Sequence, residues 1–136
     1  MKRLAIGLAL ILASTTAGAQ SVEVASGDWS NIPTIRPRGV MHMGPRVLNQ
    51  MHDMAAREVC TLPGFTQRRI DLAIPFIIRF TPAGGVERLV VRDVGCRELE
   101  TLVAGLVLRM TEAGEFSPTG TNRAGWYRSE LSFVSM

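Results

Sequence analysis

The chain has 136 residues, of which 46% are hydrophobic and 20% are charged, a composition typical of a folded domain and unlike that of a disordered chain. Its 15 basic residues include Lys2 and Arg3, and the remaining 13 face 12 acidic residues, so the charge beyond the amino terminus nearly balances. A nucleic-acid site needs a clustered positive excess. The composition therefore argues for one globular domain that does not bind nucleic acid.

The amino terminus has the pattern of a secretory signal peptide. Two positive charges precede an apolar stretch of ten residues, Leu4 to Ala13, which is half of the roughly 20 residues that a membrane-spanning helix needs. Small residues then predict cleavage between Ala19 and Gln20. We therefore expect residues 1–19 to be a signal peptide, the protein to be periplasmic or secreted, and no stable membrane insertion after cleavage.

The next part of the chain predicts a tail followed by a helix. Residues 20–44 contain several proline and glycine residues without sustained periodicity, which predicts a flexible amino-terminal tail. A helix is expected to begin at Pro45, because the fixed φ of proline suits the first helical turn. Apolar residues then follow at helical spacing, at Val47, Leu48, Met51, Met54, Ala55 and Val59. The helix is expected to end by Gly64.

Two strands are expected after this helix. The clearest strand pattern is an unbroken apolar alternation at Ile70, Leu72, Ile74, Phe76, Ile78 and Phe80. Pro75 has no N–H group, so that side of its backbone is expected to meet an edge or a bulge. A glycine-containing turn at 81–85 leads to a second strand over 86–92, and the two strands are expected to form a hairpin.

A second helix and a third strand complete the pattern. The helix is expected to begin near Cys96, with acidic residues in its first turn, where the helix dipole favours negative charge. Its apolar stripe consists of Leu99, Leu102, Val103, Leu106, Val107 and Met110, and Gly114 suits its end. A third strand is expected over 125–134. The order α-β-β-α-β predicts an α+β domain, a small three-stranded antiparallel sheet with two helices packed on one face.

The chain has two cysteines, Cys60 and Cys96, and both lie beyond the signal peptide. An isolated pair in an oxidising compartment favours a structural disulfide over a metal or redox site. The sequence has no C-x-x-C motif, the spacing that would indicate redox chemistry. We therefore expect these two residues to form a disulfide between the end of the first helix and the start of the second.

Three segments carry a resemblance to a known family. Residues 80–86 (FTPAGGV) form a strand and turn, residues 114–118 (GEFSP) an aromatic-x-Pro turn, and residues 129–133 (SELSF) a terminal strand. In order and spacing these segments resemble the C-terminal domain of the energy-transducing TonB family. The resemblance implies a TonB-C-like fold over residues 45–136 and a terminal strand region that pairs with an extended segment of a partner. We recognise neither that family's membrane anchor nor its proline-rich spacer, and so expect an accessory role.

The third strand carries the candidate partner-binding residues. Trp126, Arg128 and Glu130 share the face opposite the helices by the alternation of a strand. Exposed main-chain groups at a sheet edge give affinity for an added strand, and side chains select it. Trp and Arg are also common interface anchors. We therefore expect a cell-envelope module, monomeric or weakly dimeric, that binds an envelope protein or peptide by strand addition. Alternatively, these side chains are ordinary solvated residues that protect an edge.

A second hypothesis is a soluble periplasmic copper-binding protein. Met41, His42 and Met43 combine thioether and imidazole groups, which suit the soft ion Cu(I). His52 also has methionine neighbours, but adjacent helical residues do not converge on one ion. A third hypothesis is a structural envelope protein without a ligand.

The sequence shows no catalytic constellation. There is no G-x-S-x-G elbow, and His52 and Asp53 are consecutive residues of a predicted helix, so their side chains diverge. Glu98 and Glu100 likewise lie on different sides of their helix. We therefore expect no enzymatic activity and no cofactor.

Overall fold

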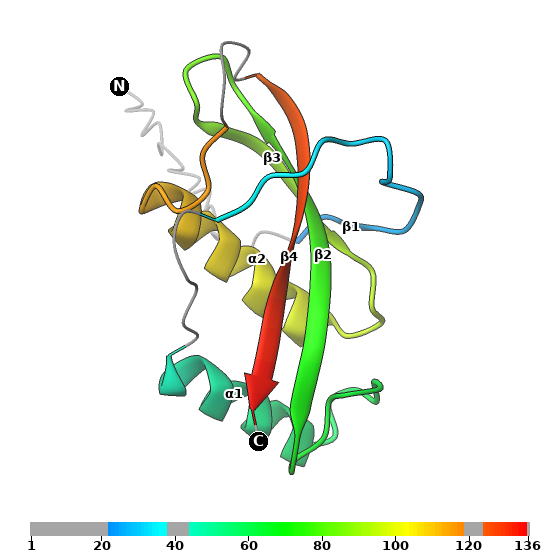
Figure 1. Cartoon of the computed structure of the whole chain (residues 1–136). Helices are drawn as coiled ribbons and strands as arrows, with labels where there is room; N and C mark the ends of the chain where they lie inside the picture. The colour runs from blue at the N-terminus through cyan, green and yellow to red at the C-terminus, as the bar shows by residue number, and fades with distance from the viewer. Residues whose placement is uncertain (1–21, 38–43, 119–123, 136) are drawn as a thin grey trace, which may run out of the picture.

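The computed structural model of the chain describes residues 22–37, 44–118 and 124–135. The predicted signal peptide lies outside these ranges. Two helices and four strands follow one another along the chain (Figure 1). In order they are β1 (Val24–Ala25), α1 (Pro45–Ala56), β2 (Ile70–Phe80), β3 (Val86–Arg92), α2 (Arg97–Glu112) and β4 (Gly125–Ser135).

The strands form one sheet in the order β1-β3-β2-β4. β2 is central and antiparallel to both neighbours, and it pairs with β4 along its whole length, from Ile70 opposite Ser135 to Phe80 opposite Gly125. The predicted α+β class is confirmed. The predicted three-stranded, purely antiparallel sheet is wrong, because β1 adds a fourth strand, parallel to β3, before α1. Two residues are too few to show strand periodicity, so the sequence pattern could not reveal β1.

The alternation of β2 directs one side of the sheet into the core. Phe76 and Ile78 are fully buried, whereas Ile77 between them points to the opposite face. Pro75 lies one residue before Phe76, which is the first β2 residue paired with β3. By the alternation of the strand, an N–H at position 75 would point toward β3. Because Pro75 lies outside the paired part of β2 and β3, its lack of an N–H costs that pairing no residue.

Both helices contribute to the core on the same side of the sheet (Figure 1). Pro45 occupies the start of α1, as predicted, and Met51 and Met54 of that helix are buried. α2 buries its predicted stripe against the sheet, with Leu99, Val103 and Val107 fully buried. The helix ends at the cap residue Ala113, and the following Gly114 has a φ of 77°, a conformation that glycine adopts readily. The apolar periodicities therefore predicted which helix faces are buried.

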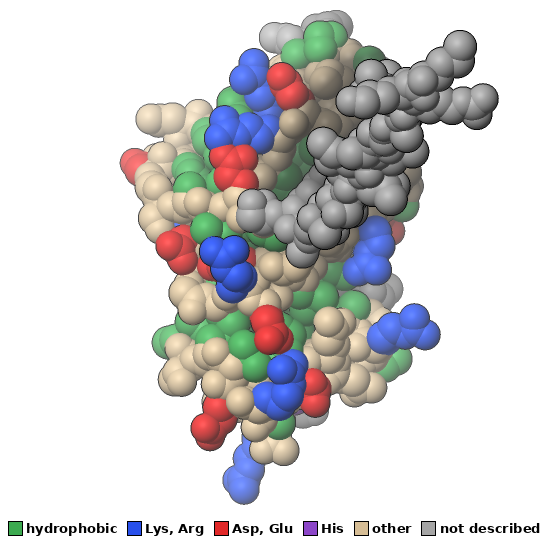
Figure 2. Space-filling view, turned by 180° about the vertical axis from the view of Figure 1, so that it is seen from behind, with side chains coloured by type: hydrophobic (Ala, Val, Ile, Leu, Met, Phe, Trp, Pro, Cys, Tyr) green, Lys and Arg blue, Asp and Glu red, His purple; other side chains and the backbone are tan. Residues whose placement is uncertain are grey.

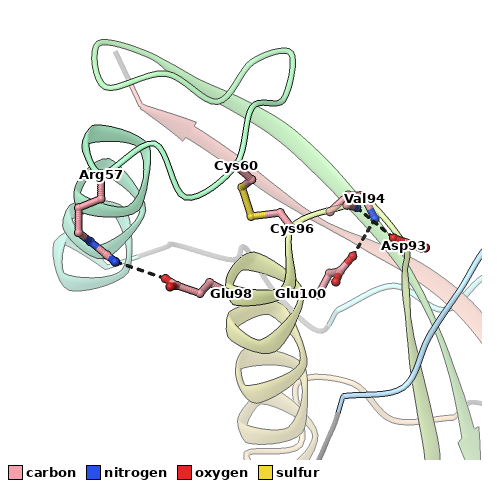
Figure 3. Close-up of a disulfide and its surroundings, with 8 residues drawn as sticks. Arg57, Cys60, Asp93, Val94, Cys96, Glu98 and Glu100 are labelled. Carbon is pink, nitrogen blue, oxygen red and sulfur yellow. Dashed lines mark hydrogen bonds and ion pairs between the residues drawn. A yellow bond between two sulfur atoms is a disulfide. The ribbon is translucent and has the colours of Figure 1, made fainter.

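The start of α2 is tied to the preceding loop by a buried carboxylate. The side chain of Glu100 is only 5% exposed, and its Oε2 accepts the N–H of Val94 at 2.8 Å. Glu100 lies in the first turns of the helix, where negative charge is favourable. Figure 3 shows this carboxylate beside the bond between Cys60 and Cys96.

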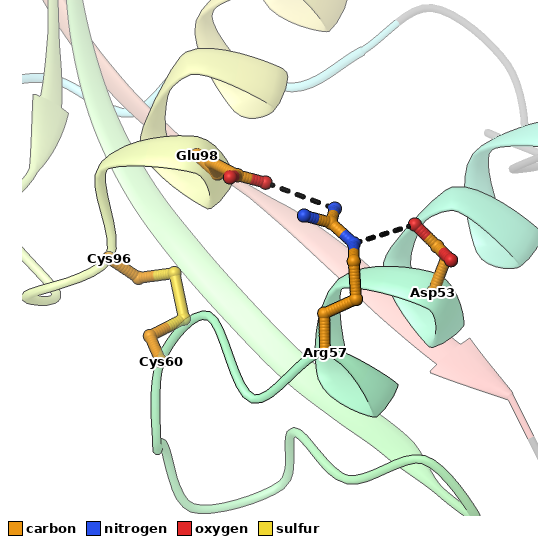
Figure 4. A network of polar contacts seen from close by, with 5 residues as sticks. All are labelled: Asp53, Arg57, Cys60, Cys96 and Glu98. Carbon is orange, nitrogen blue, oxygen red and sulfur yellow. Dashed lines mark hydrogen bonds and ion pairs between the residues drawn. A yellow bond between two sulfur atoms is a disulfide. The ribbon is translucent and has the colours of Figure 1, made fainter.

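The predicted disulfide between Cys60 and Cys96 is present, with a Cα–Cα distance of 5.5 Å. It connects the segment after α1 to the residue that caps α2. An ionic network lies at the same junction, where Arg57 contacts Asp53 at 3.0 Å and Glu98 at 3.3 Å (Figure 4). All three charged side chains are about half exposed or more, so screening leaves their pairing weak. The covalent bond therefore dominates the link between the helices.

No helix in the described ranges is both long and apolar enough to cross a membrane.

Replacing both cysteines (Cys60→Ser with Cys96→Ser) is expected to lower the free energy of unfolding by about 3 to 4 kcal/mol. The bond spans 36 residues, and without it the unfolded chain regains the corresponding loop entropy. Denaturant unfolding of the oxidised protein and of the double variant measures this difference. Asp53→Asn is the matched control, because it removes an exposed ion pair at the same junction and should have a much smaller effect. A double variant as stable as the parent protein would contradict the prediction.

Candidate functional site

Residues 26–37, here called the strap, cross the face of the sheet that the helices leave uncovered (Figure 1). The strap leaves β1 beside β3 and reaches the far side of the sheet, where Thr34 bridges to Arg128 of β4. The sequence assigned these residues to a flexible tail, and the structure binds them to the sheet instead. The reason is that main-chain bonds and a few side-chain contacts hold the strap, and neither produces a hydrophobic period.

Arg92 of β3 fixes the first part of the strap. Its guanidinium lies 3.9 Å from the ring centroid of Trp29, and its Nη1 donates to the carbonyl of Gly27 at 2.6 Å. Asp28 accepts the N–H of Ser30 at 3.0 Å. Hydrogen bonding with Ser30 holds the pKa of Asp28 below its ordinary value, and the positive charges of Arg128 and Arg92 lower it further. These contacts hold a charged turn of the strap against β3.

The second part of the strap is bound to β4 at one residue, Arg128. The N–H of Arg128 donates to the carbonyl of Pro33 at 2.8 Å, and the N–H of Ile35 donates to the carbonyl of Arg128 at 2.9 Å. The Nε of Arg128 also donates to the carbonyl of Ile32 at 2.8 Å. Ile35 itself is only 5% exposed and belongs to the main core cluster. The chain therefore binds both main-chain groups and part of the side chain of Arg128.

Two prolines explain why this bridge extends no further. In a parallel ladder, donors on the strap would be needed at every second residue, at positions 33, 35 and 37. Pro33 and Pro37 have no N–H, so only Ile35 can donate. Among the described residues, no hydrogen bond joins the main chain of Glu130 to the strap. The spacing of the prolines thus limits the strap to a single bridge.

Among the described residues, no main-chain group pairs with the rest of the outer edge of β4. Because the N–H and C=O of Arg128 point away from β2, those of Glu130, Ser132 and Val134 do so as well. All three residues are exposed, Val134 to 64%. Apart from contacts within the sheet, the described part of the chain offers these outward groups no main-chain partner. We call residues 130–134 the open edge.

The three predicted partner-binding residues have different environments. Trp126, Arg128 and Glu130 do share the face opposite the helices, which is the alternation expected from their spacing. Trp126 is partly buried, with the guanidinium of Arg88 at 5.7 Å from its ring centroid. The strap engages Arg128, and only Glu130 lies on the open edge. Sequence reasoning did not single out Ser132, Val134 or the strap.

A hollow of about 680 Å³ lies where the strap meets the open edge. Its floor includes Pro75 of β2, and its walls include Trp29 from the strap. The charged side chains that line it are Asp28, Arg36, Arg92, Arg128 and Glu130. Ser132 also lines it, so the hollow is continuous with the open edge.

A second hollow of about 790 Å³ lies between β3 and α2 and is lined in part by Val86, Leu89, Ala104 and Leu108. It lies toward the other edge of the sheet from β4, where β1 pairs with β3. It therefore adds nothing to the open edge.

The structure bears on only part of the copper hypothesis. Met41, His42 and Met43 lie outside the described residues. The Nδ1 of His52 lies 2.8 Å from the carbonyl of Gln67, and its Nε2 lies 2.9 Å from Oγ of Ser135, so this ring ties α1 to the end of β4. Within the ranges that are described, no group of three or more His, Cys, Asp or Glu side chains is placed to hold a metal ion.

Comparison with known proteins finds no match to a family model, to a curated protein or to a solved structure. The candidate site therefore rests on this chain's own residues, those of the open edge and of the adjoining hollow.

Replacing Ile35 (Ile35→Ala) is expected to lower the free energy of unfolding by about 2 to 4 kcal/mol, because it removes a buried side chain that anchors the strap. Thr34→Ala is the control, since Thr34 is exposed and its change should stay within about 0.5 kcal/mol. Denaturant unfolding measures both values. Equal and small effects of the two substitutions would show that the strap is not docked.

Proposed function

We propose that the chain is an exported accessory module of the cell envelope that binds an extended segment of a protein or peptide by strand addition at the open edge. One observation carries this proposal: main-chain groups at Glu130, Ser132 and Val134 point outward beside a residue, Arg128, that already pairs with an added segment. The strap supports it, because main-chain hydrogen bonds already join this chain's own residues to the edge at Arg128. An incoming segment would form the same kind of main-chain hydrogen bond with the outward groups of Glu130, Ser132 and Val134.

The open edge is long enough for a short peptide. Five residues of strand span about 16 Å, and the buried side chains of Leu131 and Phe133 hold this part of β4 firmly against the core. A rigid template reduces the entropy lost on binding. The open edge therefore offers a preorganised main-chain surface.

Side chains on the open edge would provide selectivity. Glu130, Ser132 and Val134 alternate along β4 and offer a charge, a hydroxyl group and an apolar surface in turn. A partner strand would place its own alternate side chains beside them. The exposed Val134 favours an apolar residue at the far end of the bound segment.

The charge pattern supports a protein or peptide partner over a nucleic acid. Arginines pair with nearby acidic groups, as in the contacts of Arg57 with Glu98, Arg79 with Glu87 and Arg88 with Glu23. On the face seen in Figure 2, acidic and basic side chains lie next to one another. Such interspersed charge lacks the clustered positive potential that a polyanion requires.

Two further features support export. The Cys60–Cys96 disulfide is typical of an oxidising compartment, and residues 1–19 have the signal-peptide pattern with cleavage between Ala19 and Gln20. The resemblance of residues 45–136 to TonB C-terminal domains also supports a terminal strand that receives a partner segment. We propose a periplasmic or secreted monomer, or weak dimer, without enzymatic activity or cofactor.

A photo-crosslinking side chain at position 134 tests strand addition in cells that export the protein. We expect a discrete protein adduct that is lost in the Ser132→Pro background and kept in the Ser132→Ala background. Proline removes one outward N–H without touching the bonds to β2, whereas alanine removes only the hydroxyl group. Mass spectrometry identifies the adduct.

The same crosslinker at position 97, on the exposed first turn of α2, is the background control. Thermal unfolding of the Ser132→Pro protein checks that its fold is retained. An adduct of equal yield in the Ser132→Pro and Ser132→Ala backgrounds would rule out main-chain pairing, and labelling no stronger at 134 than at 97 would rule out a partner at this edge.

A further inference from the structure

We propose that the segment bound at the open edge is the carboxy-terminal end of its partner, and that its terminal carboxylate occupies the hollow between the strap and the sheet. The inference rests on the proposed strand addition and names the class of segment that it would accept. The anion would lie beside the guanidinium groups of Arg92 and Arg128.

The strap requires the bound segment to stop or turn. A chain that pairs with Val134, Ser132 and then Glu130 meets the strap at the next outward position, because Arg128 already bonds to Pro33 and Ile35. It cannot continue along β4 without displacing the buried side chain of Ile35. A chain terminus meets this constraint more simply than an internal segment, which would have to bend sharply.

The hollow lies where such a terminus would arrive. Glu130 and Ser132 of the open edge line it, together with Trp29 of the strap and Pro75 of β2. Its volume of about 680 Å³ exceeds the room that one terminal residue needs. The last residue of a bound segment could therefore turn into the hollow from the edge.

Guanidinium donors supply the complementary charge. The Nη1 of Arg92 donates to the carbonyl of Gly27, and the Nε of Arg128 donates to the carbonyl of Ile32. Each guanidinium has five N–H groups in a planar fork that matches a carboxylate. Within the described ranges, the remaining N–H groups of the Arg92 and Arg128 guanidinium groups have no protein acceptor. They are available to an anion.

The net charge of the hollow favours a single negative group. Three basic residues and two acidic residues line it: Arg36, Arg92 and Arg128, with Asp28 and Glu130. Asp28, Arg92 and Arg128 all line the hollow, and after the larger effect of hydrogen bonding with Ser30 the two arginines lower the pKa of Asp28 further. The two acidic groups oppose a second negative charge. A terminal carboxylate without an acidic last side chain fits this balance.

Strand direction agrees with this assignment. A segment antiparallel to β4 begins near Val134 and ends near Glu130, so its carboxylate reaches the arginines. A parallel segment would instead bring an amino terminus to them, and its positive charge would be repelled. Antiparallel pairing is also slightly more stable per residue. The edge and the hollow therefore favour the same end of a partner.

The test uses a pool of random ten-residue peptides, prepared once with free carboxylates and once with carboxy-terminal amides, and the secreted form of the full chain. We expect peptides selected from the free-acid pool to bind about 10- to 100-fold more weakly after amidation, which is the loss of charge-assisted hydrogen bonds. Arg92→Gln and Arg128→Gln should each reduce this ratio of free-acid to amide affinity. Arg97→Gln, on the exposed start of α2, should leave the ratio unchanged.

The ratio separates carboxylate recognition from simple loss of folding, because unfolded protein lowers both affinities equally. If selected peptides bind equally well as acids and amides, and Ser132→Pro abolishes both, the carboxylate inference is overturned while strand addition stands. If the parent protein retains neither pool more strongly than the Ser132→Pro protein does, strand addition itself is overturned and the carboxylate inference fails with it.

Discussion

One main-chain bridge, between Arg128 of β4 and residues 33 and 35 of the strap, determines which part of the β4 edge the strap closes. The bridge closes the middle of an edge strand that would otherwise be open along its length. Because prolines lie on both sides of the single available donor, Ile35, the strap lacks the N–H groups that would continue the ladder in either direction. The same contact brings the strap over the sheet and creates the hollow that adjoins the open part. The closed position at Arg128, the open edge beyond it and the charged hollow beside it therefore all follow from the bridge between Arg128 and the strap.

The open edge is tolerable because the rest of the molecule holds β4 in place. β4 pairs with β2 over eleven residues, and its inner face contributes Leu131 and Phe133 to the core. His52 ties the end of the strand to α1, and the disulfide ties the segment after α1 to α2. An exposed edge invites uncontrolled pairing between copies, and a charged residue such as Glu130 opposes it. The core contacts thus hold β4 in place, and the charge of Glu130 opposes pairing between copies of the chain.

The core elements were predictable, because burial produces periodic patterns. The alternation from Ile70 to Phe80 and the apolar stripe of α2 located β2 and the second helix, and the isolated cysteine pair predicted the disulfide. The strap was not predictable in the same way, since main-chain bonds use N–H and C=O groups that every residue except proline carries in full. Arg128 shows the consequence: its position on the outward face was predictable, but its capture by Pro33 and Ile35 was not. The spacing of Pro33 and Pro37 around Ile35 has a meaning only once the parallel bridge is known.

Amide hydrogen exchange of β4, residue by residue, tests most directly the claim that the edge is closed at one position and open beyond it. The N–H of Arg128 should be protected, as should those of Leu131 and Phe133, which point toward β2. The N–H groups of Glu130, Ser132 and Val134 should exchange orders of magnitude faster. Protection of Glu130 and Ser132 equal to that of Arg128 would contradict an open edge. Exchange of Arg128 as fast as that of Ser132 would contradict the bridge to the strap.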